Sequence, residues 1–186
     1  QIVINKNLTF IGTDNPVIHQ TASPTGYTIP ESTGTWEPIF LVYGGTATGG
    51  SITGTGQVTV NVSGITIDGN DRIPSPNTRK AVGFLYRNVV GGVEHSIVRE
   101  MGILSPSGNS WGIVAYGYSD VNIHGNTLSG YAKGGIVVNG DPSATIHTVI
   151  DGNTATGPTY VAGLNLAPNG IQIGFGATGH VTNNTV

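Results

Sequence analysis

The sequence contains no cysteine and few charged residues. Without cysteine, disulfide bonds and thiolate metal sites are excluded. Asp, Glu, Lys and Arg make up only 9% of the 186 residues, and the formal net charge is −3. The seven Lys and Arg residues form no basic stripe that could neutralise phosphates. Nucleic acid is therefore not expected as a partner.

Long apolar runs and helix-favouring stretches are also missing. No run approaches the roughly 18 apolar residues that a membrane-spanning helix requires, so no membrane span is expected. Glycine, in contrast, occurs 30 times. No stretch is rich in Ala, Glu, Lys and Leu, and the composition does not shift midway. We therefore expect one all-β domain over residues 1–186.

A repeat of near thirty residues runs through the chain. Its six-residue segment aligns without gaps and recurs after 31, 30, 27 and 31 residues, beginning at Val62, Val93, Ile123, Ile150 and Val181. A glycine followed by alternating apolar residues precedes it, at Gly83, Gly112, Gly135 and Gly170. Each repeat therefore holds about three short strands. Such a period is typical of a solenoid rather than a sandwich or barrel.

Asparagine recurs at one turn position of this repeat, as Asn126, Asn153 and Asn184. Asparagine tolerates a left-handed backbone, which a tight turn between strands favours. Stacked repeats lie about 4.8 Å apart, which brings equivalent side chains within hydrogen-bonding reach. We expect these three side chains to form one column, with their amides hydrogen-bonded along it.

The Gly-Ile-x-Val strand, followed by Asn-x-Ile-x-Gly-Asn-Thr-Leu, resembles the repeat of the pectin-lyase-like superfamily, as does the opening segment, residues 2–12. The resemblance covers nearly the whole chain. It implies a single right-handed parallel β-helix of about six rungs with loop excursions. Members of this superfamily include polysaccharide lyases, glycoside hydrolases, epimerases, phage tailspikes, adhesins and surface proteins of no known activity. Fold alone therefore does not select a function.

Segments rich in Gly, Pro, Ser and Thr separate the repeats and are interpreted as loops, at residues 20–38, 44–57, 68–80, 102–111 and 156–169. Aromatic residues lie in or beside them, namely Trp36, Trp111, Tyr118, Tyr131 and Tyr160. Exposed rings there would suit the face of a sugar. Alternatively, the rings fold back and cover apolar strands.

The outward column of the first repeated strand is mainly apolar and consists of Leu85, Val114, Val137 and Gln172. Two residues further on stand Arg87, Tyr116, Asn139 and Gly174. Neither column contains the carboxylates that a hydrolase groove requires. The apolar column instead indicates contact with a loop or a partner. Tyr116 remains a candidate for substrate binding.

The outward column of the second strand brings Glu94, His124 and Asp151 onto successive repeats, between Ser63 and Thr182. A carboxylate, imidazole and carboxylate in a row could poise a general acid or bind a divalent metal weakly. These three residues are the candidates for catalysis. The alternative is a solvated column that avoids stacking like charges.

The densest charge lies in residues 68–80. Asp68 and Asp71, with the Asn70 carbonyl, could hold Ca²⁺, the one cofactor that we consider. Arg72, Arg79 and Lys80 could pair with an acidic sugar. The spacing lacks the alternate carboxylates of an EF-hand, and a turn alone would also explain Asp, Gly, Asn and Pro here.

These features predict an extracellular or cell-surface scaffold or adhesion module that contacts polysaccharide or neighbouring protein chains. The alternative is part of a carbohydrate-active enzyme, such as a polysaccharide lyase, a glycoside hydrolase or an epimerase. Neither end of the sequence shows the polar cap or helix that solenoids normally need. We therefore expect either a portion of a longer solenoid or an uncapped subunit that pairs head to tail.

Overall fold

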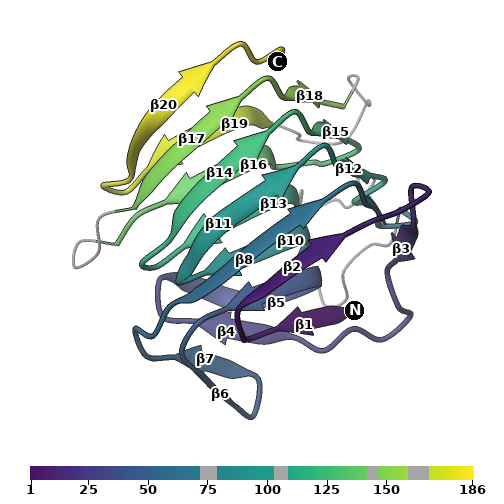
Figure 1. Cartoon of the computed structure of the whole chain (residues 1–186). Coiled ribbons are helices and arrows are strands. Elements are labelled where there is room, and N and C mark those ends of the chain that lie inside the picture. Colours follow the sequence, from purple (N-terminus) through teal and green to yellow (C-terminus); the bar gives the residue numbers. More distant parts are fainter. Residues whose placement is uncertain (72–78, 103–108, 142–145, 159–167) are drawn as a thin grey trace.

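The computed structural model describes residues 1–71, 79–102, 109–141, 146–158 and 168–186. All regular elements in these residues are β-strands, which confirms the all-β class. The strands form three sheets, here called A, B and C, and the chain visits them in turn (Figure 1). Repeats distant in sequence therefore lie one above another. Within the described residues, no helix is long and apolar enough to cross a membrane.

Sheet B is parallel throughout, because each of its strands comes from the equivalent part of a different repeat. Its strands, in spatial order, are β2 (Leu8–Ile11), β8 (Val58–Ser63), β11 (Val89–Glu94), β14 (Asp120–His124), β17 (His147–Asp151) and β20 (Thr178–Thr182). In β14 the burial alternates strictly, with Val121 and Ile123 buried and their neighbours exposed. One side of the sheet therefore faces the core and the other faces solvent.

Sheet C is also parallel and is made of short strands. They are β18 (Thr154–Thr156), β15 (Thr127–Ser129), β12 (Ile97–Arg99), β9 (Thr66–Asp68) and β3 (Val17–His19). In β12, β15 and β18 the middle residue is buried, while the first is exposed. Sheet C thus closes the core beside sheet B.

Sheet A contains the longest strands and combines the repeats with an irregular N-terminal part. Its main strands are β19 (Asn169–Gly174), β16 (Gly134–Asn139), β13 (Ser110–Tyr116), β10 (Arg79–Arg87) and β5 (Ser32–Tyr43), which also pairs with β1 (Ile2–Ile4). Three short strands extend it beyond β5, namely β4 (Tyr27–Ile29), β7 (Ser51–Thr53) and β6 (Thr46–Thr48). Pairing is antiparallel between β4 and β5 and between β6 and β7.

The strand register confirms the gap-free alignment of the repeats. Direct pairing partners in sheet B are Val62, Val93, Ile123, Ile150 and Val181. The glycine-led segments align in sheet A through Phe84, Ile113, Ile136 and Ile171. All of these except Val181 belong to the apolar core or pack against it. Residues that lie one repeat apart in the sequence are therefore direct neighbours on adjacent strands of the same sheet.

The asparagine column is confirmed. The Asn126 side-chain amide donates to Asn153 Oδ1 at 3.0 Å, and that of Asn153 donates to Asn184 Oδ1 at 2.9 Å. Asn126 and Asn153 are each only 1% exposed. The reason given for asparagine was wrong, because the left-handed residue is the preceding one, as in Gly125 and Gly152. Asparagine is instead needed for its inward amide, which satisfies buried carbonyls of the preceding repeat.

The expected loops 20–38 and 44–57 were wrong in part, since they contain β4, the start of β5, β6 and β7. We call residues 27–36 and 46–54 the cover. Its apolar residues Ile29, Trp36 and Ile52 cluster with the outward column of sheet A, including Leu85 and Val114. The contact expected for that column is therefore made by a segment of the same chain.

Of the two interpretations of the aromatic residues, burial is correct for Trp36 and Tyr131, which are 1% and 0% exposed. The Trp36 ring packs against Trp111, with centroids 5.1 Å apart. Trp111 and Tyr118 are half-buried, and Tyr160 lies outside the described residues. Trp36 and Trp111 therefore pack between the cover and sheet A, whereas Tyr131 belongs to the main core.

Candidate functional site

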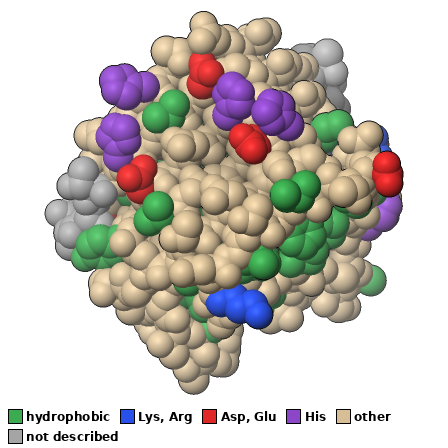
Figure 2. All heavy atoms as spheres, in the orientation of Figure 1, with side chains coloured by type: hydrophobic (Ala, Val, Ile, Leu, Met, Phe, Trp, Pro, Cys, Tyr) green, Lys and Arg blue, Asp and Glu red, His purple; other side chains and the backbone are tan. Residues whose placement is uncertain are grey.

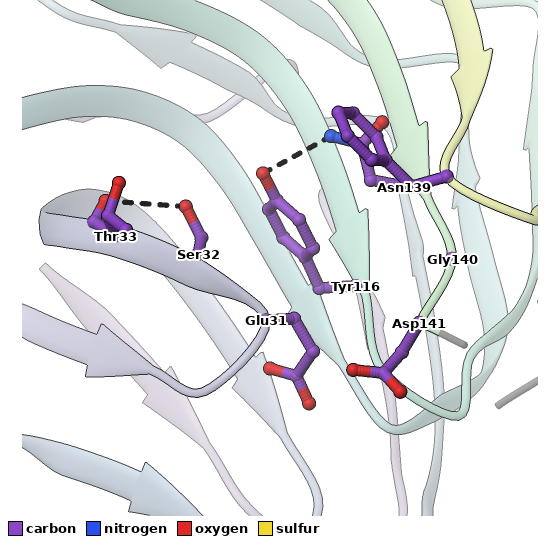
Figure 3. A pocket seen from close by; sticks show the side chains of 8 residues that line it. Glu31, Ser32, Thr33, Tyr116, Asn139, Gly140 and Asp141 are labelled. Atoms are coloured by element: carbon purple, nitrogen blue, oxygen red, sulfur yellow. Dashed lines mark hydrogen bonds between the residues drawn. The ribbon is translucent and has the colours of Figure 1, made fainter. Parts of the chain in front are cut away.

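A half-enclosed pocket of about 420 Å³ lies where the cover meets the ends of β13, β16 and β19 (Figure 3). We call it the cover pocket. Its lining residues are Glu31, Ser32, Thr33, Tyr116, Asn139, Gly140, Asp141 and Phe175. The volume lies within the range of small-molecule sites, roughly 300–1,000 Å³.

A chain of side-chain hydrogen bonds runs along the outer surface of sheet A into this pocket. Asn169 donates to Gln172, and Gln172 donates to Asn139, each at 2.9 Å. Asn139 then donates to the Tyr116 hydroxyl oxygen at 3.2 Å, as Figure 3 shows. Because the Tyr116 oxygen acts as an acceptor here, its own hydrogen can be donated to a ligand in the pocket.

Glu31 is fixed by a bidentate ion pair with Arg87. The Arg87 Nε and Nη2 donate to the two Glu31 oxygens at 2.9 and 2.7 Å, and Nη1 donates to the Gly54 carbonyl at 3.0 Å. The side chains of Arg87 and Glu31 are 3% and 6% exposed. Arg87 thus links both parts of the cover to β10. The positive charge of Arg87 is balanced by the carboxylate of Glu31.

The opposite wall is formed by Asp141 and Phe175. A Cβ at Gly140 would lie 2.6 Å from the Phe175 carbonyl oxygen, so only glycine permits this close approach. Phe175 has a φ of 53°, which is strained for a bulky residue, and it is 74% exposed. Such strain often marks a binding site. The turn therefore holds an aromatic ring at the pocket, which Asp141 also lines.

The pocket offers a hydroxyl donor, carboxylate and amide oxygens, and an exposed aromatic ring. Sugars present hydroxyl groups at their edges and apolar C–H groups on their faces, which match this combination. Sequence reasoning identified only Tyr116 among these residues. Glu31, Asp141 and Phe175 were missed because they lie at strand ends and turns outside the repeat. The positive φ of Phe175 leaves no signal in the sequence.

The structure brings the three catalytic candidates together on the outer side of sheet B. Glu94 pairs in register with His124, and His124 with Asp151. The His124 Nδ1 lies 3.2 Å from Asp151 Oδ2. Figure 2 shows histidine and acidic side chains gathered on this face. The three line an open groove of about 690 Å³.

Asp151 is the most firmly held of the three. Its Oδ1 accepts hydrogen bonds from Thr182 Oγ1 at 2.7 Å and Asn183 Nδ2 at 2.8 Å. Those two bonds, with a smaller contribution from the nearby His124, hold the Asp151 pKa below its ordinary value. Asp151 is therefore an ionised carboxylate that orients the imidazole of His124.

His95 adjoins this column and was not singled out by the sequence. It stands at the left-handed turn position occupied elsewhere by Gly125 and Gly152, with a φ of 47°. Its ring meets that of His124 edge to face, with centroids 5.3 Å apart. A Cβ at Gly125 would lie 3.1 Å from the His95 ring, so the glycine leaves room for it.

The residues considered for Ca²⁺ already have partners within the chain. Asp68 Oδ1 accepts from the Asn70 backbone at 2.8 Å, and Oδ2 accepts from Arg99 Nε at 3.0 Å. The backbone N–H of Asp71 donates to the Glu100 carbonyl at 2.8 Å. Among the described residues, no group of three His, Asp or Glu side chains is placed to hold a metal ion.

The basic residues considered for pairing with an acidic sugar make different contacts. Arg79 pairs with the buried Glu37. Lys80 donates to the Ser32 hydroxyl at 2.9 Å and lies 4.6 Å from the Trp36 ring centroid. Burial lowers the pKa of Lys80. Lys80 therefore supports the cover, whereas Arg79 pairs with β5 just beyond it. Arg72 lies outside the described residues.

Comparisons with known proteins give no matching family model, no similar curated protein and no similar solved structure. Function must therefore be inferred from the geometry of the chain itself. That geometry combines in-register parallel strands with one half-enclosed, polar, aromatic-rimmed pocket.

Proposed function

We propose that this chain is a right-handed parallel β-helix, of the kind that the pectin-lyase-like resemblance implies, and that it serves as an extracellular or cell-surface module binding carbohydrate. The in-register stacking of the repeats in three parallel sheets supports the architecture. The buried asparagine column supports it as well, because it links successive repeats along one turn. Handedness is taken from the resemblance.

The observation that carries carbohydrate binding is the cover pocket. Phe175 offers an exposed ring at its rim, and Tyr116 offers a hydroxyl hydrogen at its wall. Asp141 and Asn139 also line the pocket, where the Asn139 Oδ1 already accepts a hydrogen bond from Gln172. An aromatic ring beside a few fixed polar groups suits a pyranose, whose apolar face packs while its hydroxyl groups exchange hydrogen bonds.

Binding without catalysis is the better-supported role for this pocket. Glycoside hydrolysis usually requires one carboxylic acid that gives a proton and one carboxylate. Both Glu31 side-chain oxygens accept hydrogen bonds from Arg87, one from Nε and one from Nη2, so both are already engaged within the chain. Glu31 is therefore poorly suited to act as the acid.

The test is a panel of neutral, amino and uronic oligosaccharides titrated into the ¹⁵N-labelled chain. We expect at least one class to shift the amide resonances of Tyr116, Asn139 and Phe175. Phe175→Ala should weaken that binding about fivefold or more, since one aromatic contact contributes about 1 kcal/mol or more. Ile97→Ala, which trims an exposed apolar side chain on sheet C, is the matched control. Binding by no class of the panel would overturn the proposal.

A carbohydrate-active enzyme is the second candidate, and one observation favours it. Asp151 orients His124 through its Nδ1, which leaves Nε2 available as a general base beside Glu94. Depolymerisation of uronate and neutral polysaccharides, with and without Ca²⁺, tests this role. Activity that disappears in His124→Asn but survives in His147→Asn would establish it. No turnover of any polymer would leave binding as the function.

A further inference from the structure

The hydrogen-bond acceptors of the cover pocket are largely used by donors of the chain itself. Both Glu31 side-chain oxygens accept from Arg87, and the Glu31 side chain is only 6% exposed. On the sheet A side, the Asn139 Oδ1 accepts from Gln172 at 2.9 Å. These oxygens therefore have little accepting capacity left for a ligand.

The acceptors on the cover side of the pocket are used in the same way. Lys80 donates to the Ser32 hydroxyl oxygen at 2.9 Å, and it also donates to the Thr33 carbonyl. The Ser32 hydroxyl in turn donates to the Thr33 carbonyl at 3.4 Å. A ligand rich in O–H or N–H donors would therefore leave some of them unpaired on entering the pocket, which weakens binding.

The Tyr116 hydroxyl is the opposite case, because its hydrogen is left for a ligand. Tyr116 is 7% exposed, and among the described residues its hydroxyl makes one hydrogen bond, accepting from Asn139 at 3.2 Å (Figure 3). Asn139 acts as the donor here because its Oδ1 is occupied by Gln172. A ligand that carries a strong acceptor would satisfy this buried donor.

The charges of the pocket favour a neutral ligand. Arg87 balances Glu31, and Asp141 has a partner within the chain. No Lys or Arg occurs among the described residues that line the pocket. A ligand carboxylate would lose its hydration here without meeting a cation, which is costly. A protonated amine would bring several N–H donors to acceptors that are already in use.

We propose that the cover pocket binds the acetyl group of an acetylated pyranose, in preference to the unsubstituted, free-amino or uronic sugar. The acetyl carbonyl accepts a hydrogen bond from Tyr116, and the methyl group packs against the exposed Phe175. The carbonyl is common to N-acetyl and O-acetyl groups, so both belong to the proposed class. This inference rests on the proposed function, since it assumes that the pocket binds carbohydrate.

The experiment compares short probes on the whole ¹⁵N-labelled chain, at a pH that keeps a free amine protonated. The probes are the dimers of glucose, O-acetylated glucose, N-acetylglucosamine, glucosamine and galacturonic acid. We expect at least one acetylated dimer to bind about tenfold more tightly than the glucose dimer, as for a buried donor that gains an acceptor. Amide resonances of Tyr116, Asn139 and Phe175 should shift, and the acetylated dimer that binds more tightly identifies the source of the acetyl group.

Tyr116→Phe keeps the ring and removes the hydroxyl hydrogen, so it should abolish most of the tenfold preference. Tyr118→Phe is the matched control, because Tyr118 is half-buried near the end of the same strand and does not line the pocket. Retention of the preference in Tyr116→Phe would overturn the inference.

Asn139→Asp tests the direction of the hydrogen bond while leaving the Tyr116 hydroxyl in place. A carboxylate can only accept, so it should draw the Tyr116 hydrogen away from the pocket and reduce the preference as Tyr116→Phe does. Asn122→Asp makes the same charge change at an exposed position of β14 and is the control. An unchanged preference in Asn139→Asp would contradict the inference. Should a variant fail to fold, the comparison of acetylated with plain dimers on the unaltered chain decides.

The two proposals fail in different ways. Equal binding of the acetylated dimers and the glucose dimer, with shifts at Tyr116 and Phe175, would overturn the preference and leave carbohydrate binding intact. Tighter binding of the glucosamine or galacturonate dimer would do the same. An absence of shifts with every dimer would overturn this inference, and extension of that result to the full panel would overturn carbohydrate binding.

Discussion

The outer sides of sheets A and B are built from the same repeat, yet the outer side of sheet A is buried and that of sheet B is exposed to solvent. In sheet A the outward column includes Leu85, Val114 and Val137, which are 0%, 0% and 4% exposed under the cover. In sheet B the equivalent positions include Glu94 and His124, which remain exposed. Burying apolar surface gains about 25 cal/mol per Å², whereas burying a charge is costly. The outward residues therefore determine which side acquires a cover.

This difference also determines the kind of site that each side can form. The cover encloses a pocket of about 420 Å³ with a fixed ion pair in its wall. Sheet B has an open groove, in which the Asp151 and His124 side chains are 29% and 47% exposed. Solvent screens charges in such a groove, so its interactions are weaker for the same geometry. Selective binding is expected on the covered side.

The largest effect should come from removing the anchor of the cover. Trp36 is 1% exposed and packs against both Trp111 and Tyr116. Trp36→Ala should lower the free energy of unfolding by about 3–5 kcal/mol, measured by urea denaturation. His147→Ala, on the exposed side of sheet B, should change it by less than about 0.5 kcal/mol. Equal effects would mean that the cover does not protect sheet A.

Breaking the ion pair beneath the pocket should be nearly as severe. Glu31→Gln leaves the Arg87 charge buried without its counter-ion, and we expect a loss of about 3 kcal/mol in unfolding free energy. Glu94→Gln makes the same chemical change on sheet B, where the carboxylate is exposed, and should be nearly neutral. A small effect at Glu31 would show that the pair is accessible to water.

The asparagine column lies in the turn between sheets B and C, away from the cover, so its loss should affect both of the sheets that the turn joins. Asn153→Ala removes hydrogen bonds with Asn126, Asn184 and the Ile123 carbonyl. At the lower part of the range of about 0.5–1.5 kcal/mol for each of these four bonds, the loss should be about 2–3 kcal/mol. Asn122→Ala, at an exposed position of β14, is the control. Hydrogen exchange should increase in sheets B and C, which this turn joins, and an increase confined to sheet A would contradict this.

The smallest effect concerns ionisation on the open side. Thr182→Val with Asn183→Gly removes the two hydrogen bonds that lower the Asp151 pKa, so this pKa should rise towards its ordinary value. A lowered pKa in the folded state stabilises the protein above the ordinary carboxyl pKa, and the benefit is lost as pH falls through the lowered value. The double variant should lose this part of its acid dependence. Carboxyl ¹³C titration measures the change, with Thr9→Val as control.

The sequence predicted what depends on repetition and missed what depends on a single long-range contact. Val93, Ile123 and Ile150 could be aligned because stacking requires the same residue type at each level. The apolar column of Leu85 and Val114 indicated contact with either a loop or a partner, and the structure shows that a segment of the same chain makes this contact. Nothing local indicated that Glu31 would meet Arg87, which lies 56 residues away.

The candidate site was predicted only in part, for the same physical reason. Glu94, His124 and Asp151 share a face because the repeat fixes their register. The sequence placed Asp68 and Lys80 in one charged loop, but Asp68 ends β9 of sheet C and Lys80 is the second residue of β10 of sheet A. Residues close in sequence separate wherever the chain passes from one sheet to the next.

The cover has a further consequence for biosynthesis. Ile29, Trp36 and Ile52 leave the ribosome well before Val114 and Val137, against which they finally pack. For that interval the nascent chain exposes apolar residues whose docking surface has not yet been made. Contacts between segments so distant in sequence also slow folding. The cover is thus the part of the chain most exposed to premature association, and the most suitable place for a chaperone to bind.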